Sequence, residues 1–292
     1  MVSPKLNTIF RAGRGSGMEK QCRITGLFSY AIKGCQATPS RTLGISPFGV
    51  EGDRGLLVLQ EDRPSNQVRL PSLTRVKARC PTPGTLEIET DRGSYTLAIV
   101  REGPRKDIEY YGNRVSVTDQ GDAISLLLSE ALETEVRLAA LPAPYARAIP
   151  LAEFASLDGA LQDRFVDVAP ALVTNEASLA DLNSRLERPI PMNRFRPNIV
   201  IDGLEPYEED RVVSLEGPGW RMERLTACER CAVTCTDQES GVRHREPLET
   251  LRGYRRREGG YAGGIMFGAY MRILGEGDAE VGQTLTVALA AS

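Results

Sequence analysis

Three cysteines stand within eight residues in the last quarter of the chain, at Cys228, Cys231 and Cys235. The first two form a C-x-x-C pair, which is typical of half of a structural zinc site, and the other half needs two further ligands. Cys235 and His244, the single histidine of the chain, are the nearest candidates. A thioredoxin-like redox pair is a second interpretation, although it normally accompanies a βαβ pattern that this stretch lacks. One or two buried cysteines in a strand are the third, and the cluster alone leaves all three open.

A pair of arginines, Arg194 and Arg196, precedes a short apolar strand expected over 198–201. Guanidinium groups bind phosphate and carboxylate through two parallel hydrogen bonds, so arginine is the usual residue for recognising such anions. Pro197 restricts the backbone directly after Arg196 and favours a fixed presentation of that side chain. The segment is consistent with an anion site, and also with two solvated arginines on a loop.

The composition narrows the classes of protein that could use these residues. The chain has 292 residues, with 36 Lys and Arg against 39 Asp and Glu and a formal net charge of −3. That balance argues against binding of nucleic acid, whose partners usually carry an excess of positive charge. No apolar run approaches the roughly 20 residues that a membrane-spanning helix needs, so we expect no membrane partner. A single histidine excludes zinc sites built on several histidines.

Six cysteines are too few for a disulfide scaffold in a chain of this length, so we expect reduced thiols and a cytoplasmic location. Residues 1–17 contain no apolar stretch long enough for a secretory signal, and we expect them to form a flexible lead. A typical domain of roughly 150 residues predicts two domains in this chain. Prolines 142, 144 and 150 mark the expected connection, which gives domains over 18–141 and 142–292.

The first expected domain, over 18–141, has a pattern of short strands, and these strands would position any functional residue in this domain. Two alternating segments flank Asp91-Arg92-Gly93, which predicts a hairpin. Asp122 is expected to cap a helix that runs to about Glu133, with its apolar residues on one face. The strands expected in this domain are 24–28, 56–59, 85–89, 95–100 and 135–141.

The second expected domain mixes strands with short helices. Asn175 opens a helix in which Leu179, Leu182 and Leu186 recur at spacings of three and four. Pro and Gly bound a shorter helix over 247–253. Many short strands with few helices predict a mainly β fold with helical additions, of the α+β class, built around a barrel. The strands expected in this domain are 170–174, 198–201, 220–225, 266–274 and 284–289.

Several motifs occur in an order that is specific to one known family. The C-terminal motifs are Asn-Glu-Ala-Ser-Leu over 175–179, Arg-Phe-Arg-Pro-Asn over 194–198, Cys-x-Arg-Cys-x-x-Thr over 228–234, Glu-Pro-Leu-Glu-Thr-Leu over 246–251 and Phe-Gly-x-Tyr over 267–270. With Tyr-Ala-Ile-Lys-Gly-Cys over 30–35 and Gly-Asp-Arg over 52–54, the chain resembles MOSC proteins of the mitochondrial amidoxime-reducing component branch. The resemblance spans roughly residues 20 to 290. It implies an N-terminal β-barrel domain followed by a MOSC β-barrel domain.

The resemblance also implies an activity. Members of this branch bind the molybdenum–molybdopterin cofactor between their two domains and reduce N-hydroxylated substrates such as hydroxylamines and amidoximes. This implies a molybdenum-dependent oxidoreductase that removes the oxygen of an N–O bond in a two-electron reduction. The electrons are expected to come from a separate ferredoxin, flavoprotein or small haem protein, because no cysteine cluster suited to a [2Fe–2S] centre follows the last expected strand.

The family's functional residues transfer onto matching positions of this chain. Cys231 matches the thiolate that binds molybdenum, and Asp237 matches an acidic residue that could orient substrate or move protons. Lys33, Arg54 and Arg196 match the groups that hold the phosphate and neighbouring polar edges of the cofactor. The resemblance further assigns cofactor contacts to Gly34, Asn198, Glu229 and Tyr270.

Three positions depart from the family pattern. Cys235 stands where the family usually has Thr, Gly34 replaces a common Ser, and Asn175 replaces Ser. None of these changes removes the expected metal thiolate. Together they predict an altered pocket, in which Cys235 could add a second thiol function.

Two rival functions remain open. MOSC domains also occur in molybdenum-cofactor sulfurases, so Cys231 or Cys235 could carry a persulfide in a sulfur transfer reaction. The lysine and arginines would also suit a non-enzymatic carrier that stores or delivers the molybdenum cofactor. An assay of N-hydroxy reduction separates the reductase from both rivals, and persulfide labelling separates the two rivals from each other.

Overall fold

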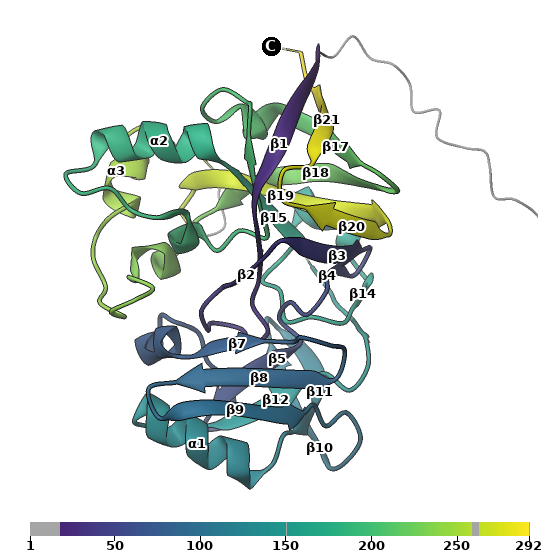
Figure 1. Cartoon of the computed structure of the whole chain (residues 1–292), viewed down its shortest axis with the longest axis vertical. Coiled ribbons are helices and arrows are strands. Elements are labelled where there is room, and N and C mark those ends of the chain that lie inside the picture. The colour runs from purple at the N-terminus through teal and green to yellow at the C-terminus, as the bar shows by residue number, and fades with distance from the viewer. Residues whose placement is uncertain (1–17, 150, 259–262, 292) are drawn as a thin grey trace, which may run out of the picture.

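The computed structural model describes residues 18–149, 151–258 and 263–291, so the lead expected over 1–17 lies outside the described residues. Figure 1 shows two lobes along the long axis of the molecule. The barrel lobe, drawn above, is a barrel with two helices beside it. The lower lobe contains smaller sheets and one helix.

Seven strands of the barrel lobe close on themselves, and an eighth strand, β2 (Thr38–Ser40), extends the sheet. The seven are, in order around the barrel, β16 (Ile199–Asp202), β15 (Ala171–Asn175), β19 (Met266–Gly275), β18 (Trp220–Glu229), β17 (Val212–Gly217), β21 (Thr284–Leu289) and β1 (Met18–Ser29). The barrel closes because β16 pairs with β1 as well as with β15. Since β1 comes from the N-terminal end, strand pairing crosses the boundary expected at residues 141 and 142, and that boundary stays a prediction.

Alternation of side chains explains the barrel core. In β21 every second residue, Leu285, Val287 and Leu289, is buried, as expected when one face of a strand points inward. The residues between them are partly or fully exposed. The fully buried side chains that fill the barrel include Ile24, Leu27, Val173, Ile199, Ile201, Met222, Met271 and Ile273.

The lower lobe is built from two antiparallel sheets and α1 (Asp122–Leu132). One sheet has the order β10 (Arg105–Tyr110), β11 (Asn113–Asp119), β12 (Arg137–Ala140), β5 (Leu56–Gln60) and β6 (Arg63–Pro64), and the other β7 (Lys77–Arg79), β8 (Thr85–Thr90) and β9 (Gly93–Ala98). Leu128 and Leu132 of α1 pack into a core with Leu56, Leu73 and Leu138. In this way the lower lobe has a hydrophobic core of its own.

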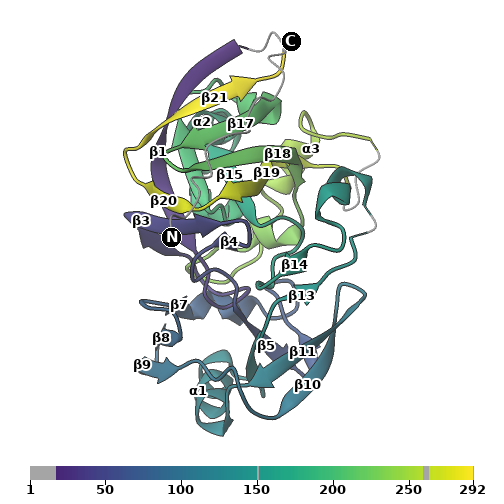
Figure 2. The same cartoon turned by 90° about the vertical axis from the view of Figure 1, so that its right-hand side faces the viewer.

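Short elements join the two lobes. β3 (Thr42–Ser46), β4 (Gly49–Val50) and β20 (Gly277–Glu280) form a small sheet, and β13 (Tyr145–Ala146) pairs with β14 (Leu161–Gln162). Figure 2 shows β13 and β14 between the barrel and the lower sheets. The 3-10 helices are η1 (Pro71–Arg75), η2 (Ala152–Leu157), η3 (Met192–Phe195), η4 (Glu208–Arg211) and η5 (Ala232–Cys235).

Two helices cover one side of the barrel, α2 (Glu176–Arg185) and α3 (Leu248–Arg252). The predicted start of α2 is confirmed, because the side chain of Asn175 accepts a hydrogen bond from the Ala177 N–H over 3.3 Å. The short helix expected over 247–253 is also present. Within the described residues, no helix combines the length and apolar character that crossing a bilayer requires.

The predicted fold class is confirmed, since the chain is mainly β with helical additions and contains a closed barrel. The hairpin around Asp91-Arg92-Gly93 is present as β8 and β9. The predicted cap of α1 is wrong. Gly121 occupies the N-cap position without a side-chain bond, and the Asp122 carboxylate pairs with Arg137 instead.

Candidate functional site

Tyr30, directly after β1, lies where the two lobes meet. Its ring is fully buried, its N–H donates to Asp53 Oδ1 over 2.8 Å, and its hydroxyl donates to the Pro197 carbonyl over 3.0 Å. The guanidinium carbons of Arg54 and Arg196 lie 4.7 and 4.3 Å from the ring centroid. The ring therefore holds two cations close together. Burial is the main reason why the pKa of Tyr30 lies above its ordinary value.

Arg54 is fixed by its backbone as well as by its side chain. Its φ of 49° lies in the left-handed region, and its N–H donates to the Tyr30 carbonyl over 2.7 Å. Nη1 donates to the carboxylate of Asp53 and to Asn198 Oδ1, the latter over 3.4 Å. Nη2 lies 3.5 Å from the Arg196 carbonyl. These contacts place the guanidinium group of Arg54 beside the segment that carries Arg196.

Arg196 follows η3 in the barrel lobe, and its φ of 55° also lies in the left-handed region. Nη1 donates to the Cys35 carbonyl over 2.8 Å. Nη2 is buried and has no hydrogen-bond partner among the described residues. A buried donor without a partner costs free energy that a bound acceptor would recover, so this nitrogen marks a position for an anion.

Asn198 joins the same site to the barrel. It is fully buried, and its Oδ1 accepts from the Leu172 N–H over 3.2 Å as well as from Arg54. Its Nδ2 donates to the Phe28 carbonyl over 3.3 Å. Asn198 thus connects strands β15 and β1 with the Arg54 guanidinium. These contacts make it a positioning residue.

Lys33 approaches the site from the loop after β1. Its nearly buried ammonium group donates to the Phe165 carbonyl over 3.2 Å and to the carboxylate of Asp167. It lies 5.5 and 5.7 Å from the ring centroids of Tyr110 and Tyr111. Lys33 is therefore a cation set in aromatic surroundings, with one internal anion as its partner.

The conformation of Gly34 explains why no larger residue stands there. Its φ is 87°, and a Cβ at this position would lie 2.8 Å from Leu73 Cδ1. A serine here would be strained by the left-handed backbone. The Gly34 carbonyl accepts from Gln67 Nε2 over 2.7 Å, so its backbone is also held from the lower lobe.

The Cys231 turn, residues 230–235, follows β18 at the end of the barrel. Cys231 is exposed, whereas Cys228 and Cys235 are buried. Burial raises the pKa of both buried thiols, which keeps them protonated and weakly nucleophilic. Arg230 donates to Cys228 Sγ over 2.6 Å and to the Phe195 carbonyl over 2.6 Å. Cys231 is therefore the thiol of this cluster that is open to a ligand.

Two further predicted residues, Glu229 and Tyr270, lie on the strands that lead to this turn. Glu229, the last residue of β18, is buried and its carboxylate accepts from the Gly264 N–H. Tyr270, on β19, is half-buried, with its ring centroid 5.7 Å from that of Phe154. Glu229 therefore anchors the backbone at Gly264, whereas Tyr270 packs against η2.

Asp237 begins the hairpin after the Cys231 turn. Oδ1 accepts from the N–H of Ser240 over 2.8 Å, from its hydroxyl over 2.9 Å and from the Glu239 N–H over 3.2 Å. Oδ2 accepts from Arg194 Nη2 over 2.8 Å. The bonds from Ser240 are the main reason why the pKa of Asp237 lies below its ordinary value. Its carboxylate is thus ionised and fully engaged in holding the hairpin.

The structure brings Lys33, Arg54 and Arg196 to one junction but does not support a zinc site. No group of three or more His, Cys, Asp or Glu residues within the described ranges is placed to hold a metal ion. Cys228, the first residue of the C-x-x-C pair, faces the guanidinium of Arg230, which would repel a second cation. All six cysteines are free.

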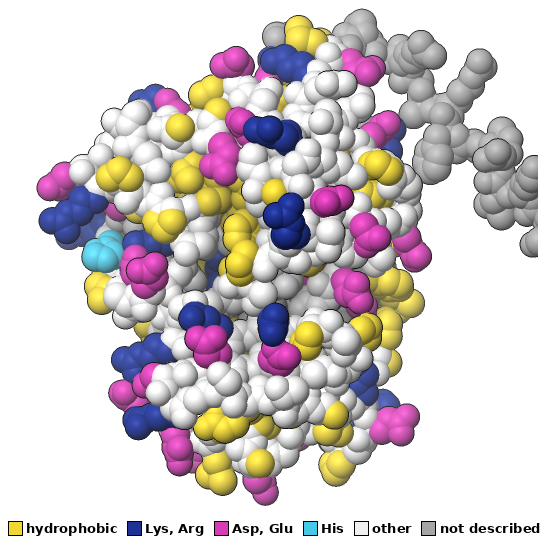
Figure 3. Space-filling view, in the orientation of Figure 1, with side chains coloured by type: hydrophobic (Ala, Val, Ile, Leu, Met, Phe, Trp, Pro, Cys, Tyr) yellow, Lys and Arg dark blue, Asp and Glu magenta, His cyan; other side chains and the backbone are white. Residues whose placement is uncertain are grey.

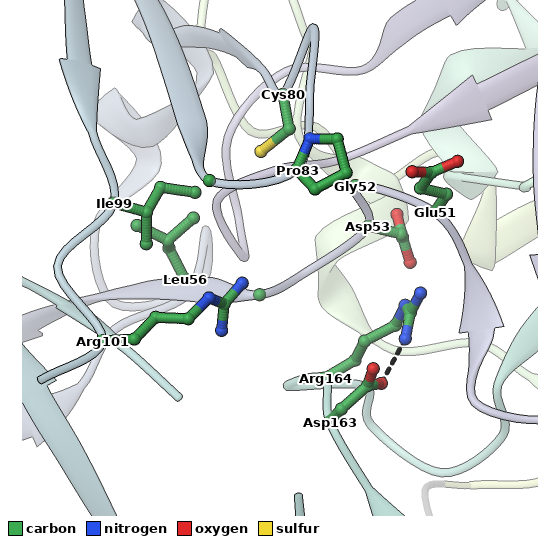
Figure 4. Close-up of a pocket in the computed structure, with 12 residues that line it drawn as sticks. Glu51, Gly52, Asp53, Leu56, Cys80, Pro83, Ile99, Arg101, Asp163 and Arg164 are labelled. Atoms are coloured by element: carbon green, nitrogen blue, oxygen red, sulfur yellow. Dashed lines mark hydrogen bonds and ion pairs between the residues drawn. The ribbon is translucent and has the colours of Figure 1, made fainter. Parts of the chain in front are cut away.

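The structure also has a separate pocket, and Figure 4 shows Cys80 and Pro83 on one side of it and Arg101 and Arg164 on the other. Its lining shares Asp53 with the site around Tyr30. The Cys80 thiol is half-buried, and burial raises its pKa to about 11. None of the predicted site residues lines this pocket. The predicted site and this pocket are therefore distinct, although both include Asp53.

Comparisons with known proteins identify the family. The model of the MOSC domain matches residues 161–286, and the model of the MOSC N-terminal beta barrel domain matches residues 21–135. Mitochondrial amidoxime reducing component 2 of Bos taurus is 30% identical, over 93% of this chain and 85% of that protein. This chain belongs to the MOSC family. Its resemblance to the amidoxime-reducing branch is confirmed.

Two further relatives of this MOSC protein are informative. Mitochondrial amidoxime-reducing component 1 of Homo sapiens is 29% identical, over 89% of this chain and 81% of that protein. Molybdenum cofactor sulfurase of Caenorhabditis briggsae is 28% identical, over 85% of this chain but only 33% of that protein. The relatives of this chain therefore include an amidoxime-reducing component and a protein named for molybdenum cofactor.

In this MOSC chain the site combines residues from both family segments. Lys33 and Arg54 lie in the segment matched by the N-terminal beta barrel model, and Arg196 and Cys231 lie in the MOSC segment. The motifs predicted all four of these residues, but not the roles of Tyr30 and Asp53, which hold the arginines in place. The motifs over 30–35 and 52–54 contain both residues and are the signal that could have found them.

Proposed function

We propose that this protein is an oxidoreductase that uses the molybdenum–molybdopterin cofactor to reduce N-hydroxylated compounds. The observation that carries the proposal is the junction of the two lobes, where the guanidinium groups of Arg54 and Arg196 lie against the Tyr30 ring. The Phe195 carbonyl, next to Arg196, accepts a hydrogen bond from Arg230, the neighbour of the exposed Cys231. The names of the amidoxime-reducing relatives support the substrate class. The sulfurase relative supports the association with molybdenum cofactor.

The residues at the junction fit a phosphorylated, sulfur-rich cofactor. Lys33, Arg54 and Arg196 supply positive charge, of which Lys33 and Arg54 already share theirs with the carboxylates of Asp167 and Asp53. The Nη2 of Arg196, without a partner among the described residues, is a donor that an anionic ligand would satisfy. Cys231 supplies an exposed sulfur, and soft thiolate ligands suit a metal that is also bound through sulfur. Coordination would deprotonate this thiol. The charge of the junction and the chemistry of its donor atoms therefore both fit this cofactor.

Each residue has a role in this proposal. Cys231 would bind the molybdenum, and Lys33, Arg54 and Arg196 would hold the phosphate and polar edges of the pterin. Asn198 and Glu229 would fix the backbone and the guanidinium groups around the cofactor. The backbone at Gly34 and the ring of Tyr270 would line the cofactor site.

When bound, the cofactor supplies the two-electron redox chemistry that the side chains of the protein lack. The protein binds and orients the N-hydroxylated substrate and keeps the positive side chains fixed at the junction. Asp237 suits positioning better than proton donation, because its carboxylate is ionised and accepts four hydrogen bonds. We therefore assign Asp237 to holding the hairpin and Arg194.

The reaction also needs an electron donor, and we propose a separate ferredoxin, flavoprotein or small haem protein. On the face shown in Figure 3, Lys and Arg side chains are interspersed with Asp and Glu side chains. This mixed surface differs from the one-sign surface that nucleic-acid binding favours. The cytoplasmic location expected from the sequence stays a prediction.

The first experiment is to measure molybdenum and pterin in protein purified from a molybdenum-replete host that makes the cofactor. We expect near-stoichiometric metal in the wild type and its loss in Cys231→Ala, together with the loss of benzamidoxime reduction by a chemical reductant. Cys80→Ala is the matched control, because this half-buried thiol lies in the separate pocket. Wild-type protein that contains no molybdenum but carries a persulfide on Cys231 would contradict the reductase and support the sulfur-transfer function.

A further inference from the structure

Three glutamines join the loop that contains Lys33 to the hairpin that follows the Cys231 turn. This glutamine clamp consists of Gln36, Gln67 and Gln238, and Gln67 and Gln238 are almost completely buried. We propose that Gln67 and Gln238 are positioning residues that hold the cofactor-binding cations at a fixed place relative to Cys231. The proposal rests on the proposed function and concerns residues to which no role has been assigned.

The centre of the clamp is a reciprocal pair of side-chain amides. Gln67 Nε2 donates to Gln238 Oε1 over 2.9 Å, and Gln238 Nε2 donates to Gln67 Oε1 over 3.0 Å. Gln67 belongs to the lower lobe, between β6 and η1, and Gln238 belongs to the hairpin at 236–243. Two hydrogen bonds between planar amides set the orientation as well as the separation of the two segments.

Every amide hydrogen of this pair has an acceptor. The second hydrogen of Gln67 goes to the Gly34 carbonyl at 2.7 Å, and that of Gln238 goes to the Thr236 carbonyl at 2.9 Å. Reversing either amide would place an oxygen against a carbonyl oxygen, so the orientation of both side chains is determined. A buried polar network in which all groups are satisfied specifies one arrangement of its surroundings.

The pair also reaches the cationic site directly. Arg196 Nη1 lies 3.4 Å from Gln238 Oε1 and donates to the Cys35 carbonyl at 2.8 Å. Gln36 Nε2 donates to the Gln238 carbonyl over 2.9 Å, which ties the loop after Lys33 to the hairpin a second time. The clamp thus contacts both the Arg196 guanidinium and the backbone on either side of Cys35.

The hairpin is pressed against the lower lobe outside the clamp as well. Arg243 Nη2 donates to the carbonyls of Gln67 and Val68 over 3.0 and 2.8 Å. At the hairpin tip, a Cβ on Gly241 would lie 2.9 Å from Thr74 Oγ1. Because the hairpin continues directly from the Cys231 turn, a shift of Gln238 would move the thiol relative to Lys33 and Arg196.

The test compares Gln67→Leu, Gln238→Leu and the double variant Gln67→Leu/Gln238→Leu. Each single change leaves a buried amide without its partner, whereas the double change replaces both by apolar groups of similar size, which is far less costly. We expect the double variant to regain much of the melting temperature that the single variants lose. We also expect it to release molybdenum during dialysis about tenfold faster than the wild type, because the contacts to Gly34 and Arg196 are gone.

Gln120→Leu is the matched control. Gln120 is equally buried and makes three hydrogen bonds, but all of them are to backbone atoms of Val100 and Thr118 inside the lower lobe. This variant should lose stability and release metal at the wild-type rate. Hydrogen exchange on protein without cofactor adds a second readout, in which Gln238→Leu, but not Gln120→Leu, accelerates exchange over residues 33–36.

The outcomes separate the two proposals. A double variant that holds molybdenum as long as the wild type does would overturn the positioning role and leave the proposed function intact. Unchanged exchange over residues 33–36 in Gln238→Leu would overturn it as well. Wild-type protein that contains no molybdenum would overturn the proposed function, and with it the role of the clamp in holding the cofactor.

Discussion

Arg194 and Asp237 form an ion pair that connects η3 with the hairpin after the Cys231 turn, with 2.8 Å between Nη2 and Oδ2. The Arg194 side chain is almost completely buried, whereas that of Asp237 is 28% exposed. Arg194 also lies two residues before Arg196. The pair therefore fixes the segment that carries Arg196, one of the proposed cofactor-binding cations, against the segment that carries the expected metal thiolate.

Replacing Asp237 by Asn should lower stability at neutral pH by about 1 to 3 kcal/mol, because a buried guanidinium loses its counter-charge. The pKa of Asp237 is lowered in the folded protein, so its stabilising effect is present at neutral pH and disappears as the pH falls through that lowered pKa. Wild type and Asp237→Asn should therefore differ in urea unfolding at pH 7 and converge in strong acid.

The same variant tests the role that the resemblance suggested for Asp237. If the residue only positions the hairpin, activity per bound molybdenum should fall by less than about tenfold. Loss of a general acid or base typically costs at least about a hundredfold. A loss of about a hundredfold or more, with the metal content unchanged, would show that Asp237 moves a proton.

Replacing Arg196 by Lys should weaken cofactor retention although the positive charge is kept. The guanidinium uses Nη1 on the Cys35 carbonyl and leaves Nη2 for a ligand, and a lysine ammonium cannot reproduce this planar arrangement. We expect molybdenum content after dialysis to fall about tenfold, in line with the loss of one charged hydrogen bond. Arg164→Lys is the control, because Arg164 is a buried arginine that bonds to the Val50 carbonyl beside the separate pocket. Equal loss of metal in both variants would contradict a specific role for Arg196.

The sequence predicted strands well where apolar residues alternate or cluster, and poorly where they do not. β8 and β9 were predicted because a turn motif separates two patterned segments. β10 was not predicted, because only Ile108 and Tyr110 of this strand are buried and the rest of it is exposed. A strand with so little buried surface leaves a weak pattern in the sequence. β11 was missed although Val115 and Val117 alternate and are buried.

The motifs predicted the site residues, but which residues they contact could be learned only from the structure. Lys33, Arg54 and Arg196 are separated by up to 163 positions, and no periodic pattern indicates that they meet. The pairing of β1 with β16 brings their segments together. The amide pair of Gln67 and Gln238 was equally invisible, because it depends on the relative placement of two loops.

Replacing Cys235 by Thr should leave both fold and reduction intact. The Cys235 thiol is buried and donates to the Arg245 carbonyl over 3.2 Å, which a threonine hydroxyl can also do. We expect the stability to change by less than about 1.5 kcal/mol, as is usual for changes that conserve volume and hydrogen bonding. Urea unfolding and benzamidoxime reduction measure the two effects. A large loss of activity with metal content unchanged would instead assign Cys235 the second thiol function that its departure from the family pattern suggested.

Glu209 should make the protein less stable as the pH rises from 4.5 to 7. The residue lies on η4, is fully buried, accepts from Ser178 Oγ over 2.7 Å and has no hydrogen-bond partner for Oε1 among the described residues. Burial raises the pKa of Glu209 from the ordinary 4.5 to about 7. Between these values the folded state binds a proton that the unfolded state releases, so stability is complete below pH 4.5 and is lost as the pH rises through 7.

Glu209→Gln should remove this dependence and be more stable than the wild type at pH 8, by an amount on the order of 3 kcal/mol. The neighbouring Glu208 is the matched control with the opposite sign. Burial alone would raise the pKa of Glu208, but the Lys20 ammonium, 2.8 Å away, outweighs burial and holds that pKa below its ordinary value. Glu208→Gln should therefore lose stability at pH 8, where the salt bridge is intact in the wild type. Urea unfolding at pH 5 and pH 8 measures all three proteins, and a wild type whose stability is equal at both values would contradict a buried, neutral Glu209.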